Sequence, residues 1–188
     1  VYKRQAPWDR NRNGISIGEG AAFALLEPAG DEASGLALLG YGESSDAHHM
    51  TAPHPEGLGA ALAMRAALAS AALAPDEIDY VNLHGTATPA NDQSEDLAVT
   101  EVFDNRIPVS GTKGWTGHTL GASGAVEAAL SLLCVEHGLL PGTLNTLTPD
   151  PALSANLVRM SEQRPIRRVL SNSFGFAGSN CALVLGRR

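Results

Sequence analysis

Three short glycine-containing segments carry polar residue types that could activate a carbonyl group. Their chemistry-bearing residues are His84, Lys113, His118 and Phe174. Two neutral histidines can each donate an Nε2 hydrogen bond to one carbonyl oxygen, which stabilises an enolate as it forms. An ammonium such as that of Lys113 favours negative charge nearby, and glycine-flanked backbone amides around Phe174 can form a second oxyanion pocket. The set therefore predicts a cleft that holds a thioester carbonyl and its enolate.

Each of these residues also has a purely structural explanation. A histidine at the end of a strand most often only packs, and a glycine-rich turn is most often only a turn. The coincidence of three such segments nevertheless favours a functional site. Lys113 adds weight, because Lys3 is the only other lysine of the chain.

The elements that must position these residues alternate between strands and helices. Apolar runs predict strands at 36–41, 78–83, 107–110, 169–173 and 181–185, and a strand–turn–strand unit over 15–26. Helices are predicted over 56–73, from residue 91 or 92, and from residue 122 to a C-cap at Gly138. Asp92 and Glu95 have the spacing of a capping box at the start of the second helix. The third helix has a predicted buried stripe of Val126, Leu130, Leu133, Cys134 and His137.

Such alternation predicts an α/β fold, a mixed sheet with helices on its faces. His84, Lys113 and Phe174 each follow a predicted strand. In open α/β sheets, ligands gather outside the carboxyl ends of the strands. We therefore expect these three residues to converge, with His118 returning to the same cleft from the loop that opens the third helix.

Composition excludes several classes of protein. The 188 residues are 44% hydrophobic and 18% charged, as in a folded globular chain, and the net charge of −7 argues against nucleic-acid binding. No apolar run approaches the length of a membrane span, and no signal peptide is recognisable. The two cysteines have no CxxC spacing, so neither a zinc site nor a disulfide scaffold is indicated, and a reducing cytoplasm is expected. His48, His49 and His54, near Asp46, favour a polar loop over a metal site.

Three longer segments resemble the C-terminal motifs of the β-ketoacyl-acyl-carrier-protein synthases, the elongating condensing enzymes of thiolase fold. They are residues 84–92 (HGTATPAND), 112–124 (TKGWTGHTLGASG) and 172–180 (NSFGFAGSN). Residues 9–20 and 44–51 are similar to further segments of that family. The likeness covers nearly the whole chain. It implies the C-terminal half of a thiolase-like fold, with residues 1–30 ending the N-terminal half and residues 31–188 forming the C-terminal domain. The first five residues, which do not begin with Met, are expected to be foreign to the protein.

The resemblance implies decarboxylative Claisen condensation of malonyl-acyl carrier protein with an acyl-enzyme thioester, in fatty-acid or polyketide-type synthesis. It assigns His84 and His118 to the malonyl thioester oxygen, Lys113 to tuning that pair with Glu95 as its ion partner, and the Phe174 amide to an oxyanion hole. Thr86 and Thr88 would contact the phosphopantetheine arm of the carrier protein, and Phe176 would act as a mobile gate. No bound cofactor is expected, and the implied partners are acyl carrier protein, malonyl and acyl thioesters, and a second subunit in a homodimer or heterodimer.

The chain departs from the family at several positions. Ala177 and Ser179 replace the more usual glycine and threonine, so a Cβ at 177 is expected to stiffen the gate. Cys134 and Cys181 read as small buried hydrophobes, since nothing near them in sequence would lower a thiol pKa. The family's nucleophilic cysteine segment is not in this sequence, so the chain is expected to be inactive in condensation alone.

Two other functions remain open at this point. A non-catalytic partner subunit of the chain-length-factor type would resemble the synthases, but it has no need of two histidines and Lys113. A thiolase-like degradative enzyme would need a cysteine acid/base where Phe174 and its neighbours stand. Arg164, Arg167 and Arg168 form a small basic cluster that an acidic carrier protein could contact.

Overall fold

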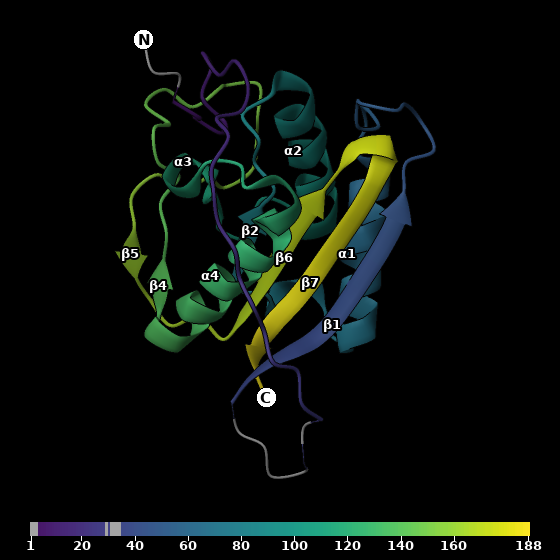
Figure 1. The fold of residues 1–188 in the computed structure, drawn as a ribbon, viewed down its shortest axis with the longest axis vertical. Helices are drawn as coiled ribbons and strands as arrows, with labels where there is room; N and C mark the ends of the chain where they lie inside the picture. The colour runs from purple at the N-terminus through teal and green to yellow at the C-terminus, as the bar shows by residue number, and fades with distance from the viewer. Residues whose placement is uncertain (1–3, 29, 31–34) are drawn as a thin grey trace.

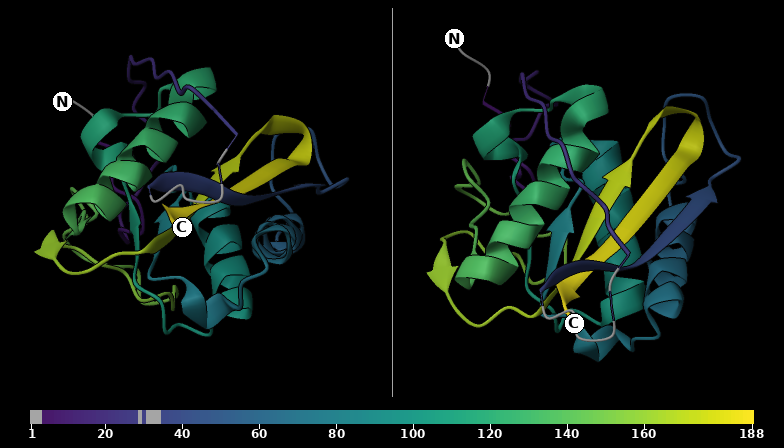
Figure 2. Two further views of the ribbon diagram at one scale, coloured as in Figure 1. Left: turned by 90° about the horizontal axis from the view of Figure 1, so that it is seen from below. Right: turned by 60° about the horizontal axis from the view of Figure 1, so that its bottom comes forward.

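A five-stranded mixed sheet forms the centre of the protein. The computed structural model describes residues 4–28, 30 and 35–188. The strand order is β1-β7-β6-β2-β3, in which β6, β2 and β3 are parallel and β7 and β1 run antiparallel to their neighbours. Helices α1 and α2 cover one face and α4 lies on the other (Figure 1; Figure 2). The predicted α/β fold is therefore confirmed.

The bounds of the elements follow the apolar runs closely. The strands are β1 (Leu36–Ser45), β2 (Tyr80–Leu83), β3 (Val109–Gly111), β4 (Leu139–Leu140), β5 (Glu162–Gln163), β6 (Arg168–Phe174) and β7 (Ser179–Arg187). The α-helices are α1 (Leu58–Ala71), α2 (Pro89–Phe103), α3 (Lys113–Thr116) and α4 (Ser123–His137). Short 3₁₀ turns lie at Pro75–Glu77, Leu120–Ala122 and Phe176–Gly178. None of the described helices is long and apolar enough to cross a membrane.

Two cores hold the layers together. The larger lies between the sheet and helices α1 and α2, and includes Met64, Leu83, Phe103 and Leu170. The smaller lies beneath α4, around Tyr80 and Val169. Trp8 belongs to the larger core and is 2% exposed, so the N-terminal segment around it packs against this domain. The boundary predicted at residue 30 stays a prediction, and residues 1–3 of the segment read as foreign lie outside the described part.

The strand–turn–strand unit predicted over 15–26 is wrong. The segment runs extended across the α4 side of the molecule, and its only bridge joins Ile17 to His118 (Figure 1). Phe23 and Leu25 are 99% and 85% exposed. An apolar run becomes a strand only where another strand pairs with it, and no described strand lies beside this one. The predicted strand at 36–41 forms β1, an edge strand of the sheet with Tyr41 59% exposed.

The prediction of which side of α4 is buried is also wrong. The buried residues of this helix are Ser123, Glu127, Ser131, Cys134 and Val135. Leu133 is 47% exposed, and His137 at the last turn is exposed as well. The helix thus turns a largely polar face inward, for a reason that lies in the site.

Glycine at position 42 lets α1 lie directly on β1. A Cβ built there would lie 2.2 Å from the Ala63 carbonyl oxygen and 2.4 Å from the Ala67 nitrogen, both of them backbone atoms. We expect Gly42→Ala to lower the free energy of unfolding by about 1–3 kcal/mol, because helix and strand must separate to admit the methyl group. Urea denaturation would measure the loss. Gly35→Ala is the control, since nothing lies within 4 Å of its Cβ position; an equal loss in both variants would contradict the packing argument.

Candidate active site

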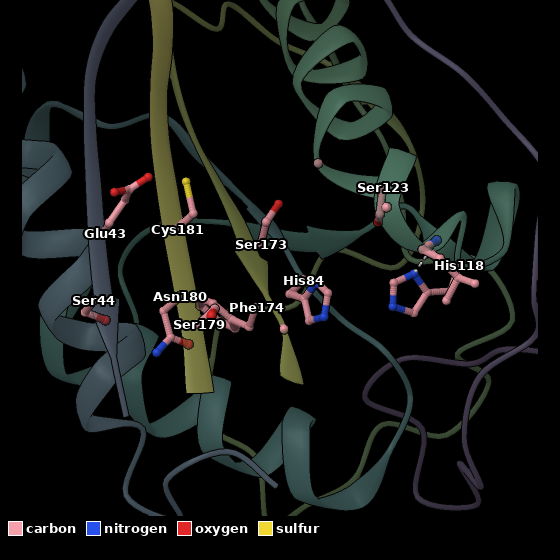
Figure 3. Close-up of a pocket in the computed structure, with 14 residues that line it drawn as sticks. Glu43, Ser44, His84, His118, Ser123, Ser173, Phe174, Ser179, Asn180 and Cys181 are labelled. Atoms are coloured by element: carbon pink, nitrogen blue, oxygen red, sulfur yellow. Dashed lines mark hydrogen bonds between the residues drawn. The ribbon is translucent and has the colours of Figure 1, made fainter. Parts of the chain in front are cut away.

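The three predicted site segments meet at one edge of the sheet. The parallel strands β2, β3 and β6 are neighbours, and His84, Lys113 and Phe174 lie at or just after their carboxyl ends. The rings of His84 and His118 are 5.5 Å apart between centroids, and those of His84 and Phe174 are 5.7 Å apart. Lys113 Nζ lies 3.3 Å from His84 Nδ1. The convergence predicted from the sequence is therefore what the structure shows (Figure 3).

Lys113 fixes the tautomer of His84. An ammonium can donate hydrogen bonds but cannot accept them, so the Nδ1 that faces Lys113 Nζ must be the acceptor. The proton of the neutral imidazole is then on Nε2, which leaves Nε2–H as a donor. Burial lowers the pKa of His84 well below its usual value, and the charge of Lys113 and the neighbouring His118 lower it further. His84 is thus a neutral Nε2 donor at physiological pH.

His118 is prepared in the same way by the backbone. Its Nδ1 accepts the N–H of Leu120 at 3.2 Å, which again leaves the proton on Nε2. Its own backbone pairs with residues 16–18, through bonds of 2.8 Å to the Ser16 carbonyl and 3.0 Å from the Gly18 N–H. Burial, with the charge of Lys113 as a second cause, lowers the pKa of His118 to about 4. Both histidines are therefore neutral donors beside the same cavity.

The ion partner of Lys113 is Glu127, so the prediction of Glu95 is wrong. Lys113 and Glu127 form a salt bridge in which both side chains are 1% exposed. Ser123 also donates to Glu127 at 3.2 Å, and burial raises the pKa of this carboxyl group. This pair explains the polar inner face of α4. The signal that could have revealed it was the i, i+4 spacing of Ser123, Glu127 and Ser131 on an otherwise apolar helix.

Glu95 holds the turn that carries His84. Its Oε1 accepts the His84 N–H at 2.7 Å, and its Oε2 accepts the Gly85 N–H at 2.9 Å. Asp92 accepts the Ala87 N–H at 3.1 Å in a similar way. The predicted capping box is therefore wrong: α2 begins at Pro89, and these two carboxylates bind backbone groups outside the helix. Burial raises the pKa of Glu95 to about 7 and that of Asp92 to about 6.

A cavity of about 530 Å³ opens beside the two histidines. Its lining consists of Glu43, Ser44, His84, His118, Leu120, Gly121, Ser123, Gly124, Ser173, Phe174, Gly175, Ser179, Asn180 and Cys181. Glu43, Cys181 and Ser173 lie toward one end, and the histidines lie toward the other (Figure 3). Cys181 is half-buried rather than buried as predicted, whereas Cys134 is buried, and burial raises the pKa of both thiols.

The Phe174 amide is oriented by the β6–β7 turn. Gly175 N–H donates to the Ser179 carbonyl at 2.8 Å, and Phe174 pairs with Asn180. Because hydrogen-bonded and non-hydrogen-bonded pairs alternate along an antiparallel ladder, the Phe174 N–H points away from β7. It faces the side of β6 where the pairing with β2 has ended at Ser171.

Three predicted substrate contacts lie outside this cavity. Thr86 and Thr88 share a hydrogen bond of 2.8 Å between their hydroxyls before α2, and Thr86 is 7% exposed. Phe176 is 77% exposed on the turn after β6. The next residue, Ala177, has φ of 61°, in the left-handed region that favours glycine, and its N–H donates to the Met50 carbonyl at 2.8 Å. The roles of the two threonines and of the gate stay predictions.

Two further clusters lie apart from the cavity. No group of three potential metal ligands occurs among the described residues; the rings of His48 and His54 meet edge to face, and the His54 N–H donates to Asp46 at 2.9 Å. Arg164, Arg167 and Arg168 lie at or just before the start of β6, whereas Phe174 ends that strand, roughly 20 Å away at about 3.3 Å per residue. Arg168 is paired with Glu77 and Arg164 with Glu162.

We expect Glu127→Gln to destabilise the protein by about 3–5 kcal/mol, because it leaves the ammonium of Lys113 buried without a counter-charge. Chemical denaturation of the variant would measure the loss. Glu136→Gln is the matched control on the same helix, since Glu136 is half exposed. Equal stability of the Glu127 and Glu136 variants would show that Lys113 does not need this partner.

We expect the ring of His118 to titrate with a midpoint near pH 4, far below the ordinary value of about 6.5, because burial and Lys113 disfavour its charged form. The imidazole would be neutral above that midpoint and cationic only below it. NMR titration of histidine-labelled protein would measure this, with His118→Gln to assign the signal. A midpoint between 6 and 7 would contradict the arrangement.

Comparisons with known proteins agree with this geometry. Residues 36–147 match the family model described as the C-terminal domain of beta-ketoacyl synthase. The mitochondrial 3-oxoacyl-[acyl-carrier-protein] synthase of Arabidopsis thaliana is 44% identical over 95% of the chain and 41% of its own length. A ketosynthase solved with its chain length factor from Xenorhabdus doucetiae is 42% identical, with a TM-score of 0.85 over 97% of this chain and 46% of that one.

A third relative is a ketosynthase of a type II polyketide system, solved with its acyl-carrier protein and bound to a hexaketide. It is 27% identical, with a TM-score of 0.86 over 98% of this chain and 47% of that one. The chain thus spans less than half the length of each of these relatives. Its mixed sheet and layered helices are the thiolase-like fold of the ketosynthases. The chain belongs to the β-ketoacyl synthase family, of which it carries the C-terminal domain.

Proposed function

We propose that the protein containing this domain is an acyltransferase that condenses a malonyl thioester with an acyl-enzyme thioester, releasing CO₂, in fatty-acid or polyketide-type synthesis. One observation carries the proposal: two neutral histidines, both fixed as Nε2 donors, lie side by side at one cavity. Donors of this kind act on an oxygen that gains negative charge. The names of the relatives support the same reaction class.

In the proposed first step, His84 and His118 donate to the carbonyl oxygen of the malonyl thioester. The bond between the carboxylate and the α-carbon then breaks and CO₂ leaves. The electron pair of that bond forms an enolate, whose oxygen accepts hydrogen bonds from the two Nε2–H groups. Fixed Nε2–H donors suit this step, because they are already directed to the place where negative charge develops and need no reorganisation. Lys113 keeps His84 neutral and correctly oriented through Nδ1.

In the proposed second step, the enolate carbon attacks the thioester carbonyl of an acylated cysteine supplied by the rest of the protein. The new carbon–carbon bond gives the β-ketoacyl product, and the cysteine leaves as a thiolate. The Phe174 N–H, directed away from β7, would stabilise the oxyanion of this step. Without that cysteine, the domain is expected to be inactive in condensation by itself.

The proposed partners follow from the same reaction. Acyl carrier protein would deliver both thioesters on its phosphopantetheine arm, with Thr86 and Thr88 near the arm and Phe176 as the gate. The whole protein would act as a homodimer or heterodimer in the cytoplasm. We do not propose carrier-protein docking at Arg164, Arg167 and Arg168, because they lie at the far end of β6 from the cavity. A non-catalytic chain-length-factor role is less well supported, since it would leave the two oriented histidines without a use.

We expect His84→Ala and His118→Ala each to slow decarboxylation of malonyl-acyl carrier protein by the full-length protein about 10²–10³-fold, because each removes one donor to the enolate oxygen. Release of CO₂ from labelled malonyl carrier protein would measure the rate. His137→Ala is the control, because His137 is exposed at the far end of α4. Decarboxylation at the wild-type rate by both active-site variants would rule out the proposed function.

A further inference from the structure

Asn172 has no role in the site described above, yet its side chain reaches it. It lies on β6 two residues before Phe174 and is completely buried. Its Nδ2 donates to Glu95 Oε1 at 3.1 Å and also lies 3.5 Å from the sulfur of Met64. Asn172 therefore connects the strand that ends in Phe174 to the carboxylate that holds the His84 turn.

The connection is direct, because one oxygen of Glu95 accepts hydrogen bonds from both the His84 turn and β6. Glu95 Oε1 accepts the His84 N–H as well as the Asn172 amide, while Oε2 accepts the Gly85 N–H. Two amides of the turn after β2 and one side-chain amide of β6 thus bind one carboxylate, and Asn91 of the same helix donates to it at 3.5 Å. Without the Asn172 donor, Glu95 would keep only the turn amides and Asn91 of its own helix as donors, and no described side chain of β6 would bind the carboxylate that holds the turn.

The oxygen of the Asn172 amide indicates that the NH₂ group is the part of the side chain that this position requires. Asn172 Oδ1 is buried and has no hydrogen-bond partner among the described residues. An apolar side chain of similar size would avoid the cost of burying that unpartnered oxygen. An asparagine here is therefore poorly explained by packing alone, and its single useful polar contact is with Glu95.

The charges around Glu95 make this contact matter. Burial raises its pKa to about 7, the hydrogen bonds from Gly85, His84 and Asn172 oppose that rise, and Asp92 on the same helix adds to it. Arg12 partly offsets Asp92 at 3.4 Å, and on the other side His84 is neutral beside Lys113. A carboxylate that accepts N–H bonds holds them more strongly than a neutral acid does. Loss of one donor would therefore weaken the hold on the turn near neutral pH.

We propose that Asn172 is a positioning residue, which acts through Glu95 to fix the His84 turn relative to the Phe174 strand. This inference rests on the proposed function for its effect on rate, but not for its effect on the turn. It makes Asn172 the link between the malonyl-binding histidine and the second oxyanion donor.

The test uses Asn172→Leu in the full-length protein and the pH dependence of malonyl decarboxylation. Ionised Glu95 is the form that holds the turn, so the wild-type rate should rise with pH through about 7. The variant should have its acid limb about one pH unit higher and a rate about fivefold lower at pH 7, because a higher pKa leaves less carboxylate. In a Glu95→Gln background, which cannot titrate there, the Asn172 change should no longer move the limb.

Asn82→Leu is the matched control. Asn82 is a buried asparagine on the neighbouring strand β2 that donates to Ser171 at 3.2 Å and makes no hydrogen bond to Glu95. It should lower stability without moving the acid limb. An unmoved limb in Asn172→Leu, or an equal shift in Asn82→Leu, would overturn the proposal.

Hydrogen exchange separates this inference from the proposed reaction. Peptides containing the His84 and Gly85 amides should exchange faster in Asn172→Leu than in the wild type and in Asn82→Leu. If no variant or wild-type protein decarboxylates malonyl thioesters, the proposed function fails while faster exchange still supports the link. Unchanged exchange at these two amides would refute the link whatever the activity.

Discussion

A buried ammonium that can donate hydrogen bonds but accept none organises this site. Lys113 lies in the interior because Glu127 neutralises its charge, and α4 turns its polar side inward to supply that carboxylate. Since Lys113 also faces Nδ1 of His84, the imidazole can carry its proton only on the side of the cavity. The charge of Lys113 thus decides which nitrogen of His84 can donate a hydrogen bond into the cavity, and α4, Lys113 and His84 depend on one another.

Two acidic residues near the start of α2 also act by holding other groups in place. Glu95 and Asp92 bind backbone N–H groups of residues 84, 85 and 87, while Asp92 also accepts the Trp8 N–H at 2.9 Å. Carboxylates that would ordinarily begin a helix are used to close a turn and to fasten the N-terminal segment over it. The helix begins instead with Pro89, whose missing N–H leaves one unpaired donor fewer in the first turn.

The apolar runs predict the strands of the main sheet and the order of the helices. They also predict that His84, Lys113, His118 and Phe174 converge, because the carboxyl ends of parallel strands meet at one edge of a sheet. Contacts between faces could not be predicted in this way. Glu95 and Glu127 are on helices that cover opposite faces of the sheet, and sequence spacing does not show which of them an ammonium will reach. The strands predicted over residues 15–26 were wrong for a related reason, because strand propensity carries no information about a pairing partner.

The bridge between Ile17 and His118 has a consequence for assembly of the domain. It joins residues about a hundred positions apart, and closing so long a loop costs entropy that no local contact repays. The sheet needs closures of the same kind, since β1 pairs with β7 and β2 with β6 across similarly long stretches of chain, so the backbone that orients His118 is expected to settle together with these pairings. The rings of His84 and His118 would then reach their positions side by side only when these distant segments of the chain have come together.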